Sequence, residues 1–152
     1  MTQLSELKAL YLADNCKRYP NLPPAVRSFP KWTGRTANGL TKMICDYINL
    51  SGGRAYRINT QGQYDAKLKK WRYSGMRRGL PDIQAVVNSK FVGIEVKINF
   101  DRQSEHQKKI QSEIESAQGS YFIATSFEQF FTWYNEQFTP GSIRAKQEID
   151  EK

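Results

Sequence analysis

The sequence predicts an α/β fold in which a central mixed β-sheet is flanked by helices. Segments that alternate apolar and polar residues, as strands do, lie between segments whose apolar residues recur at helical spacing. Residues 83–87 and 90–98 alternate on either side of a turn pair and predict a β-hairpin. A strand at 121–125 is reached from this hairpin through a helix, which favours parallel pairing. A chain of 152 residues has room for one domain with a genuine core.

The predicted elements divide the chain into three parts. A helix at 3–15 and a segment with four prolines form an N-terminal helix and proline-rich basic arm, residues 1–36. The core is expected at 37–139. The charged segment 140–152 that follows is expected to be disordered.

The core is expected to begin with a helix and a short strand. Apolar residues at helical spacing predict a helix at 37–50, which the pair Gly52–Gly53 ends. A strand at 54–59 and a turn at Gln61–Gly62 follow.

Two helices follow the hairpin. Ser104 and Gln107 have the spacing of a capping box and begin a helix that extends to about residue 118. The apolar face of this helix carries Gln107 toward the carboxylate end of the sheet, although Gln107 could equally be a capping residue only. Ser126 begins the second helix. Its aromatic stripe predicts either core packing or a dimer surface, and consists of Phe127, Phe130, Phe131, Tyr134 and Phe138.

The predicted hairpin brings two carboxylates together. If Asn88 and Ser89 form a two-residue turn, Asp82 lies directly opposite Glu95. Period-two alternation then puts Lys97 on the same face, while the alternate apolar residues line the core. A three-residue turn would shift this register, but the two acids would remain near each other.

Opposed carboxylates on one face repel, and a cation would resolve the repulsion. Oxygen ligands without a His or Cys cluster suit Mg²⁺ or Mn²⁺, which combine one or two carboxylates with waters and substrate phosphates. Lys97 would then orient water or stabilise the transition state of phosphodiester hydrolysis. The alternative is a solvated Asp82 and an edge-strand pair of Glu95 and Lys97 without a catalytic role.

The positive charge of the chain is concentrated before the carboxylates. The formal net charge is +8, and residues 17–80 alone carry fourteen Lys and Arg against two acids, a net +12. Cations bind phosphates, and exposed aromatic rings stack on unpaired bases, so the segment 64–78 predicts a nucleic-acid contact. The alternative is a solvated loop whose aromatic residues pack on the body. The predicted nucleic-acid-binding residues are Arg54, Arg57, Lys67, Lys69, Lys70, Trp71, Arg72, Arg77 and Arg78.

Other features exclude several classes of protein. The chain has no run of about 18 apolar residues, as a membrane span requires, and no signal-peptide pattern at its start, so a cytoplasmic protein without a membrane partner is expected. Cys16 and Cys45 form no CxxC motif and are expected to be reduced thiols. The single histidine, His106, falls in the first turn of a predicted helix, where it is more often exposed than catalytic.

Four motifs in order resemble the PD-(D/E)XK nuclease superfamily, and more narrowly its VRR-NUC branch, which includes nucleases similar to Holliday junction resolvases. The resemblance covers about residues 37–126. The motifs are Arg57-Ile58-Asn59, Gly79-Leu80-Pro81-Asp82, Glu95-Val96-Lys97 and Ser104-Glu105-His106-Gln107.

The resemblance implies a restriction-endonuclease-like core and a Mg²⁺- or Mn²⁺-dependent nuclease. It assigns Asp82, Glu95 and the main-chain carbonyl of Val96 as metal ligands, Lys97 as the catalytic lysine and Gln107 as an active-site residue. Many relatives carry a Glu in the first core helix, where this chain has Asn38. Asn38 could bind a metal through its amide oxygen or through water, but it brings no charge.

The sequence therefore predicts an endonuclease that hydrolyses DNA, with RNA a less favoured substrate. Standalone relatives include nucleases that dimerise to cut branched DNA, so a homodimer and a branched substrate are compatible expectations. A second hypothesis is a DNA-binding module that keeps the fold but cuts weakly or not at all. A third is a basic assembly protein that uses the aromatic helix as an interface.

Overall fold

A four-stranded mixed sheet forms the centre of the computed structural model, which describes residues 2–59 and 62–138. The strand order is β1-β4-β5-β6, with two antiparallel pairs followed by a parallel one. These four strands are β1 (Arg54–Arg57), β4 (Ile83–Val87), β5 (Lys90–Val96) and β6 (Ser120–Ala124). The α/β class and the parallel pairing of the last strand are confirmed.

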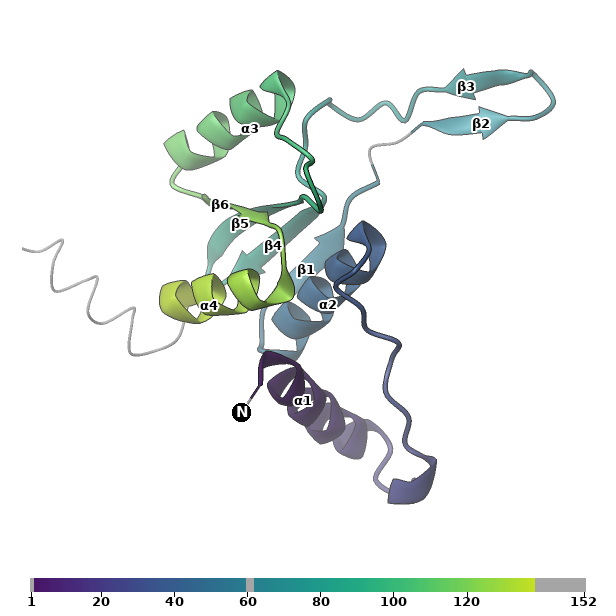
Figure 1. Cartoon of the computed structure of the whole chain (residues 1–152), viewed down its shortest axis with the longest axis vertical. Coiled ribbons are helices and arrows are strands. Elements are labelled where there is room, and N and C mark those ends of the chain that lie inside the picture. The colour runs from purple at the N-terminus through teal and green to yellow at the C-terminus, as the bar shows by residue number, and fades with distance from the viewer. Residues whose placement is uncertain (1, 60–61, 139–152) are drawn as a thin grey trace, which may run out of the picture.

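Helices cover both faces of this sheet (Figure 1). Helices α2 (Ala37–Leu50) and α4 (Phe127–Phe138) pack on one face, and α3 (Glu105–Ser116) packs on the other. Helix α1 (Gln3–Arg18) lies against α2 and α4. No helix in the described part of the chain is long and apolar enough to cross a membrane.

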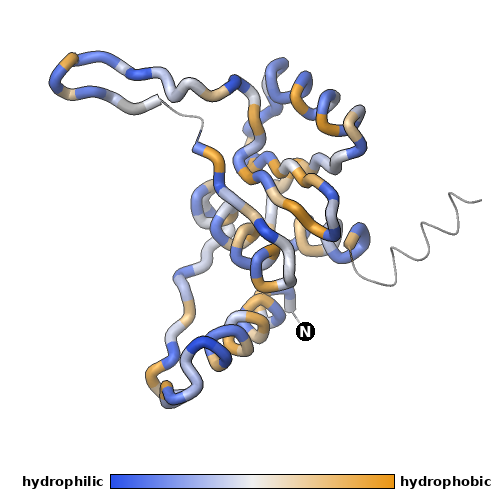
Figure 2. The backbone as a smooth tube through the Cα atoms, turned by 180° about the vertical axis from the view of Figure 1, so that it is seen from behind, coloured by the Kyte–Doolittle hydropathy of each residue, from blue (hydrophilic) through white to orange (hydrophobic). Residues whose placement is uncertain are grey.

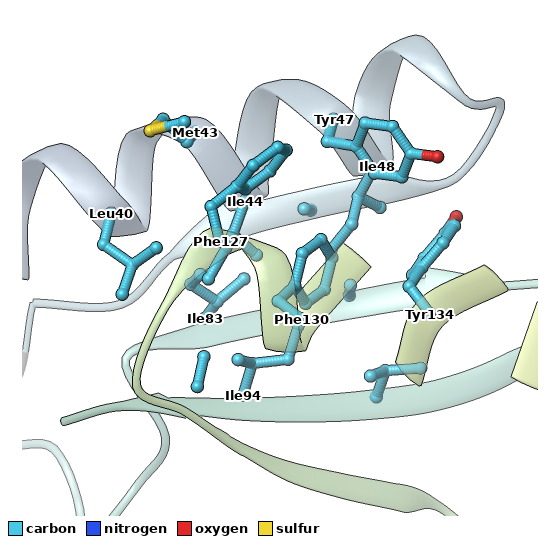
Figure 3. Close-up of a cluster of buried hydrophobic side chains, with 14 of the residues drawn as sticks. Leu40, Met43, Ile44, Tyr47, Ile48, Ile83, Ile94, Phe127, Phe130 and Tyr134 are labelled. Carbon is cyan, nitrogen blue, oxygen red and sulfur yellow. The ribbon is translucent and has the colours of Figure 1, made fainter. Parts of the chain in front are cut away.

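The main core lies between the sheet and the pair α2 and α4 (Figure 3). Tyr47 of α2 meets Phe127 and Tyr134 of α4 in edge-on ring contacts, while Ile83 and Ile94 rise from the sheet beneath them. The core interpretation of the aromatic stripe is thus confirmed: Phe127, Phe130, Tyr134 and Phe138 are buried, and Phe131 packs at the edge.

The hairpin has the predicted register. Val87 pairs with Lys90 and Ile83 pairs with Ile94, as a two-residue turn requires. Asn88 and Ser89 both have positive φ, 49° and 65°, which is the conformation of a type I′ turn. A one-residue slip would carry the buried side chains of β4 and β5 to the opposite face, so core packing and turn geometry fix the same register.

The N-terminal segment is more ordered than a linker. Helix α1 extends three residues beyond the predicted 3–15, and its Leu7 is fully buried. After a short 3₁₀ turn, η1 (Pro24–Val26), the Arg27 guanidinium donates hydrogen bonds to Asn15 Oδ1 and to the Tyr19 and Leu22 carbonyls. These bonds fold the proline-rich segment back onto the end of α1.

The largest departure from prediction is in the basic segment 64–78. In place of a loop, β2 (Gln63–Asp65) and β3 (Lys70–Arg72) form a separate two-stranded ribbon. Asp65 stabilises its turn by accepting hydrogen bonds from the N–H groups of Lys67 and Leu68. The ribbon projects from the sheet (Figure 1) and is mostly hydrophilic (Figure 2). The predicted strand at 54–59 ends at Arg57, while Gln61 and the tail from 139 onward lie outside the described residues.

Candidate functional site

The two predicted acids meet at one end of the sheet. Asp82 immediately precedes β4, and its Oδ2 accepts a hydrogen bond of 2.9 Å from the Val96 N–H of β5. The carbonyl of Asp82 accepts a second bond, of 2.7 Å, from the N–H of Ile58. Hydrogen bonds from Val96 and Ile58 thus fix Asp82 in position, and Val96 is the residue that follows Glu95.

Glu95 is a buried carboxylate with one satisfied and one open oxygen. Its residue is 3% exposed. Oε1 accepts a 2.5 Å hydrogen bond from Gln107 Nε2 and lies 3.4 Å from Lys97 Nζ, whereas Oε2 is buried without a hydrogen-bond partner among the described residues. Burial raises the pKa of Glu95 from its usual 4.5 to about 7, and the charge of Asp82 contributes to the rise. The ion pair with Lys97 opposes this shift without cancelling it.

Lys97 is 8% exposed and lies between two carboxylates. Its Nζ is 3.4 Å from Glu95 Oε1 and 3.3 Å from Asp101 Oδ2. Asp101 is a site residue that the sequence reasoning missed. Its spacing of four residues after Lys97 was the available signal, but that spacing is informative only inside a helix, and this segment is a loop.

Gln107 both caps α3 and contacts the Glu95 carboxylate. Its Oε1 accepts the Ser104 N–H at 2.8 Å and completes the capping box of α3, while its Nε2 donates to Glu95. Because a side-chain amide carries an acceptor and a donor at one end, one residue can serve the helix and the site together. The capping bond fixes the amide, and the amide fixes the Glu95 carboxylate.

The start of α3 is held in place by a glycine. Gly79 has a φ of +84°, and a Cβ there would lie 2.5 Å from the carbonyl carbon of His106 and 2.9 Å from the Gln107 nitrogen. Arg77, two residues earlier, forms a bidentate ion pair of 2.7 Å with Glu113 of the same helix. The segment that links the ribbon to β4 therefore packs directly on α3. His106, as expected, has an exposed side chain.

The acids suit a hard divalent cation. The described residues contain no cluster of three or more His, Cys, Asp or Glu side chains that could hold a metal, and a cation at this site would have two acidic donors, Asp82 and Glu95. The buried Glu95 Oε2 lacks a partner, and the charge of Asp82 helps to raise the pKa of Glu95. Both features would be relieved by Mg²⁺ or Mn²⁺, which accept two carboxylates and retain water for the remaining positions. The carbonyl of Val96 stays a predicted third ligand.

Asn38 has a different partner in this structure. Its Oδ1 accepts a 2.5 Å hydrogen bond from Arg57 Nη2. Strand alternation places Arg57 on the same face as Ala55, toward α2, whereas Asp82 and Glu95 share the α3 face. Metal binding by Asn38 would require this bond to be exchanged, so the predicted role of Asn38 is not supported by its contacts.

Tyr121 of β6 is a second residue that sequence reasoning missed. It is buried on the α3 face, packing against Gly93, and its hydroxyl has no hydrogen-bond partner within bonding distance among the described residues. Burial, followed by the nearby charge of Glu95, raises the pKa of Tyr121 to about 12, although the Gln103 side chain opposes the shift. The two unpartnered buried side-chain atoms found in the described residues therefore belong to Glu95 and to Tyr121, whose strand partner is Gly93, two residues before Glu95 on the same face.

The predicted nucleic-acid-binding residues fall into two groups. Four arginines are already paired: Arg54 with the Gly53 carbonyl, Arg57 with Asn38, Arg72 with Asp65 and Arg77 with Glu113. The rest are exposed, and their side chains make no ion pair or hydrogen bond in the described structure; they are Lys67, Lys69, Lys70, Trp71 and Arg78. Of the nine predicted nucleic-acid-binding residues in both groups, Arg54 and Arg57 lie in β1, and the others lie in or beside the ribbon.

The ribbon emerges at the end of the sheet that carries the acids. Strand β1 leaves the sheet at Arg57, which pairs with Ile83, and the chain returns from the ribbon through the segment 73–81 to Asp82. The site thus joins the buried Glu95 carboxylate, the half-buried Asp82, a lysine and an adjoining basic projection. In comparisons with known proteins, the chain matches no family model and shows no significant similarity to any curated protein.

Proposed function

We propose that this chain is a Mg²⁺- or Mn²⁺-dependent endonuclease of the PD-(D/E)XK type that hydrolyses phosphodiester bonds in DNA. The observation that carries the proposal is the Glu95 carboxylate, which is buried beside Asp82 with one oxygen unpartnered. Leaving a carboxylate oxygen in this state costs free energy unless the site has a ligand. A cation shared with Asp82 is the ligand that fits.

The chain's own residues have distinct roles in this proposal. Asp82 and Glu95 would hold the cation, which when bound supplies Lewis-acid activation of the phosphate and of water. Gln107 keeps the Glu95 carboxylate oriented through its capping bond. Lys97, retained by Glu95 and Asp101, would stabilise negative charge that develops on the phosphate. The exposed lysines of the ribbon would contact the DNA backbone.

One observation favours a second candidate, a DNA-binding module that cuts weakly or not at all. The first turn of α2 contains no carboxylate, and the oxygen of Asn38 is occupied by Arg57. A metal at this site would therefore have two carboxylate ligands, Asp82 and Glu95, and none from α2. The assembly-protein hypothesis loses its basis, because the aromatic residues that it required as an interface pack in the core.

Metal-dependent cleavage distinguishes the two candidates. Labelled duplex, single-stranded, flap and four-way-junction DNA would be incubated with Mg²⁺ or Mn²⁺ and the wild-type protein, Asp82→Ala or Lys97→Ala. The nuclease proposal expects cleavage by the wild type that is lost with chelator and strongly reduced in both variants. Cleavage that survives both substitutions would contradict the assigned site, and binding without cleavage on every substrate would favour the module.

A further inference from the structure

The ribbon β2–β3 has two chemically different faces. Tyr64 and Trp71 are cross-strand partners whose rings meet at a centroid distance of 5.7 Å. Strand alternation places these two aromatic side chains on one face and Asp65, Lys70 and Arg72 on the other. The ribbon thus has an aromatic face on one side and a charged face on the other.

The aromatic face is open to solvent. Trp71 is 72% exposed, Tyr64 50% and the following Tyr73 63%. Figure 1 shows the ribbon projecting away from the helices and the central sheet, so no element of the described chain covers it. Tryptophan is a costly residue to leave in water, and an exposed aromatic pair is typical of a surface that binds a partner.

The charge around the ribbon indicates an anionic partner. Residues 63–78 contain six Lys and Arg and one acid, a net charge of +5. An open hollow of about 350 Å³ adjoins the ribbon and is lined by Tyr64, Asp65, Ala66, Lys67 and Arg72. Aromatic rings that stack on bases, combined with cations that contact phosphates, are the features by which proteins bind unpaired nucleotides. In an intact duplex the faces of the bases are covered by their neighbours, so the rings would find no stacking partner there.

The root of the ribbon is fixed relative to the carboxylates. Arg77 is paired with Glu113, and Gly79 contacts the backbone at His106 and Gln107, whose side chain bonds to Glu95. The segment that joins the ribbon to β4 is therefore anchored beside the carboxylate site.

Resting on the proposed function, we infer that the aromatic face of the ribbon, Tyr64 and Trp71, binds unpaired nucleobases and selects DNA that contains single-stranded segments or branch points over continuous duplex. The cations of the ribbon contact the adjoining phosphates. This inference names the substrate class of the same site and assigns its selection to two rings that lie outside the carboxylate cluster.

Binding in the presence of chelator tests this inference independently of cleavage. The affinity of the full chain for fluorescently labelled single-stranded, flap and duplex DNA of equal length would be measured at fixed salt. Trp71→Ala is expected to weaken binding to unpaired DNA by roughly tenfold, since a stacked base contributes on that order, and to weaken binding to duplex far less. The control is Tyr19→Ala, an exposed aromatic at the end of α1, which is expected to change neither affinity.

A second readout follows Trp71 itself. Stacking of a base on its indole is expected to quench tryptophan emission when single-stranded DNA is added, and this quenching should disappear in Trp71→Phe if Trp71 is its source. Equal losses of affinity for duplex and unpaired DNA, or unchanged affinity for both, would overturn the inference. A change of oligomeric state in Trp71→Ala at unchanged DNA affinity would also overturn it and would assign the face to a second copy of the chain. Because no metal is present, failure of the proposed nuclease activity would leave these results unaffected.

Discussion

The substitution Glu95→Gln tests whether the buried Glu95 carboxylate, beside Asp82, destabilises the metal-free protein. The glutamine introduced in this variant would keep an oxygen to accept the bond from Gln107 but would carry no charge. In the wild type, burial and Asp82 raise the pKa of Glu95 to about 7. The ionised form is therefore disfavoured in the folded protein and not in the unfolded chain.

The sign and size of the effect follow from that pKa. Below pH 4.5 both states of the chain carry the proton, and above about pH 7 neither does. Between these values the unfolded chain loses its proton first, so each rise in pH lowers the free energy of unfolding. A displacement of the pKa from 4.5 to about 7 corresponds to a loss of about 3 kcal/mol across this window.

Urea denaturation in chelator, repeated from pH 4.5 to 8, would measure this loss. Other carboxylates titrate in the same range, so the quantity of interest is the difference between the wild type and Glu95→Gln. We expect this difference to grow in favour of the variant by about 3 kcal/mol toward pH 8. Saturating Mg²⁺ at pH 8 should stabilise the wild type and leave the variant nearly unchanged. A difference that is constant from pH 4.5 to 8 would refute the reasoning.

Two further substitutions test contacts around the site. Gly79→Ala should lower the free energy of unfolding measured in urea by more than the roughly 1–3 kcal/mol that strain at a positive φ costs, because the added Cβ also clashes with α3. Gly52→Ala, at a φ of +95° with open space around it, should show the strain alone, and equal losses would contradict the contact with α3. Asn38→Asp should stabilise the protein by about 0.3–1 kcal/mol at low salt, since a carboxylate in the first turn of α2 faces the helix dipole and Arg57. No gain, or a gain that salt does not reduce, would contradict the contact of Asn38 with Arg57.

The hairpin shows which features could be predicted from sequence. Its register depends on a two-residue turn and on a strict alternation of buried and exposed positions, both of which are local. Those local features alone are sufficient to place Asp82 beside Glu95. Helix α2 was equally accessible, because its apolar residues recur at helical spacing and Gly52 and Gly53 follow its end.

Contacts formed across the fold could not be predicted in this way. The bond between Arg57 and Asn38 joins a strand to a helix nineteen residues away and redirects a residue that the motif suggested as a ligand. The ribbon escaped prediction because its strands have three residues each and bury no apolar face. Asp101 and Tyr121 belong to the site through the path of a loop and the pairing of β6, which depend on how the whole sheet assembles.

A titration with Mn²⁺, followed by electron paramagnetic resonance at pH 8, tests the central claim that Asp82 and Glu95 share a divalent cation. The signal of free Mn²⁺ falls as the ion is bound, so the measurement reports binding without DNA and without turnover. The account predicts saturable binding by the wild type, retained binding in Lys97→Ala and loss of that binding in both Asp82→Ala and Glu95→Gln. Saturable binding that persists unchanged in Asp82→Ala and Glu95→Gln would contradict it.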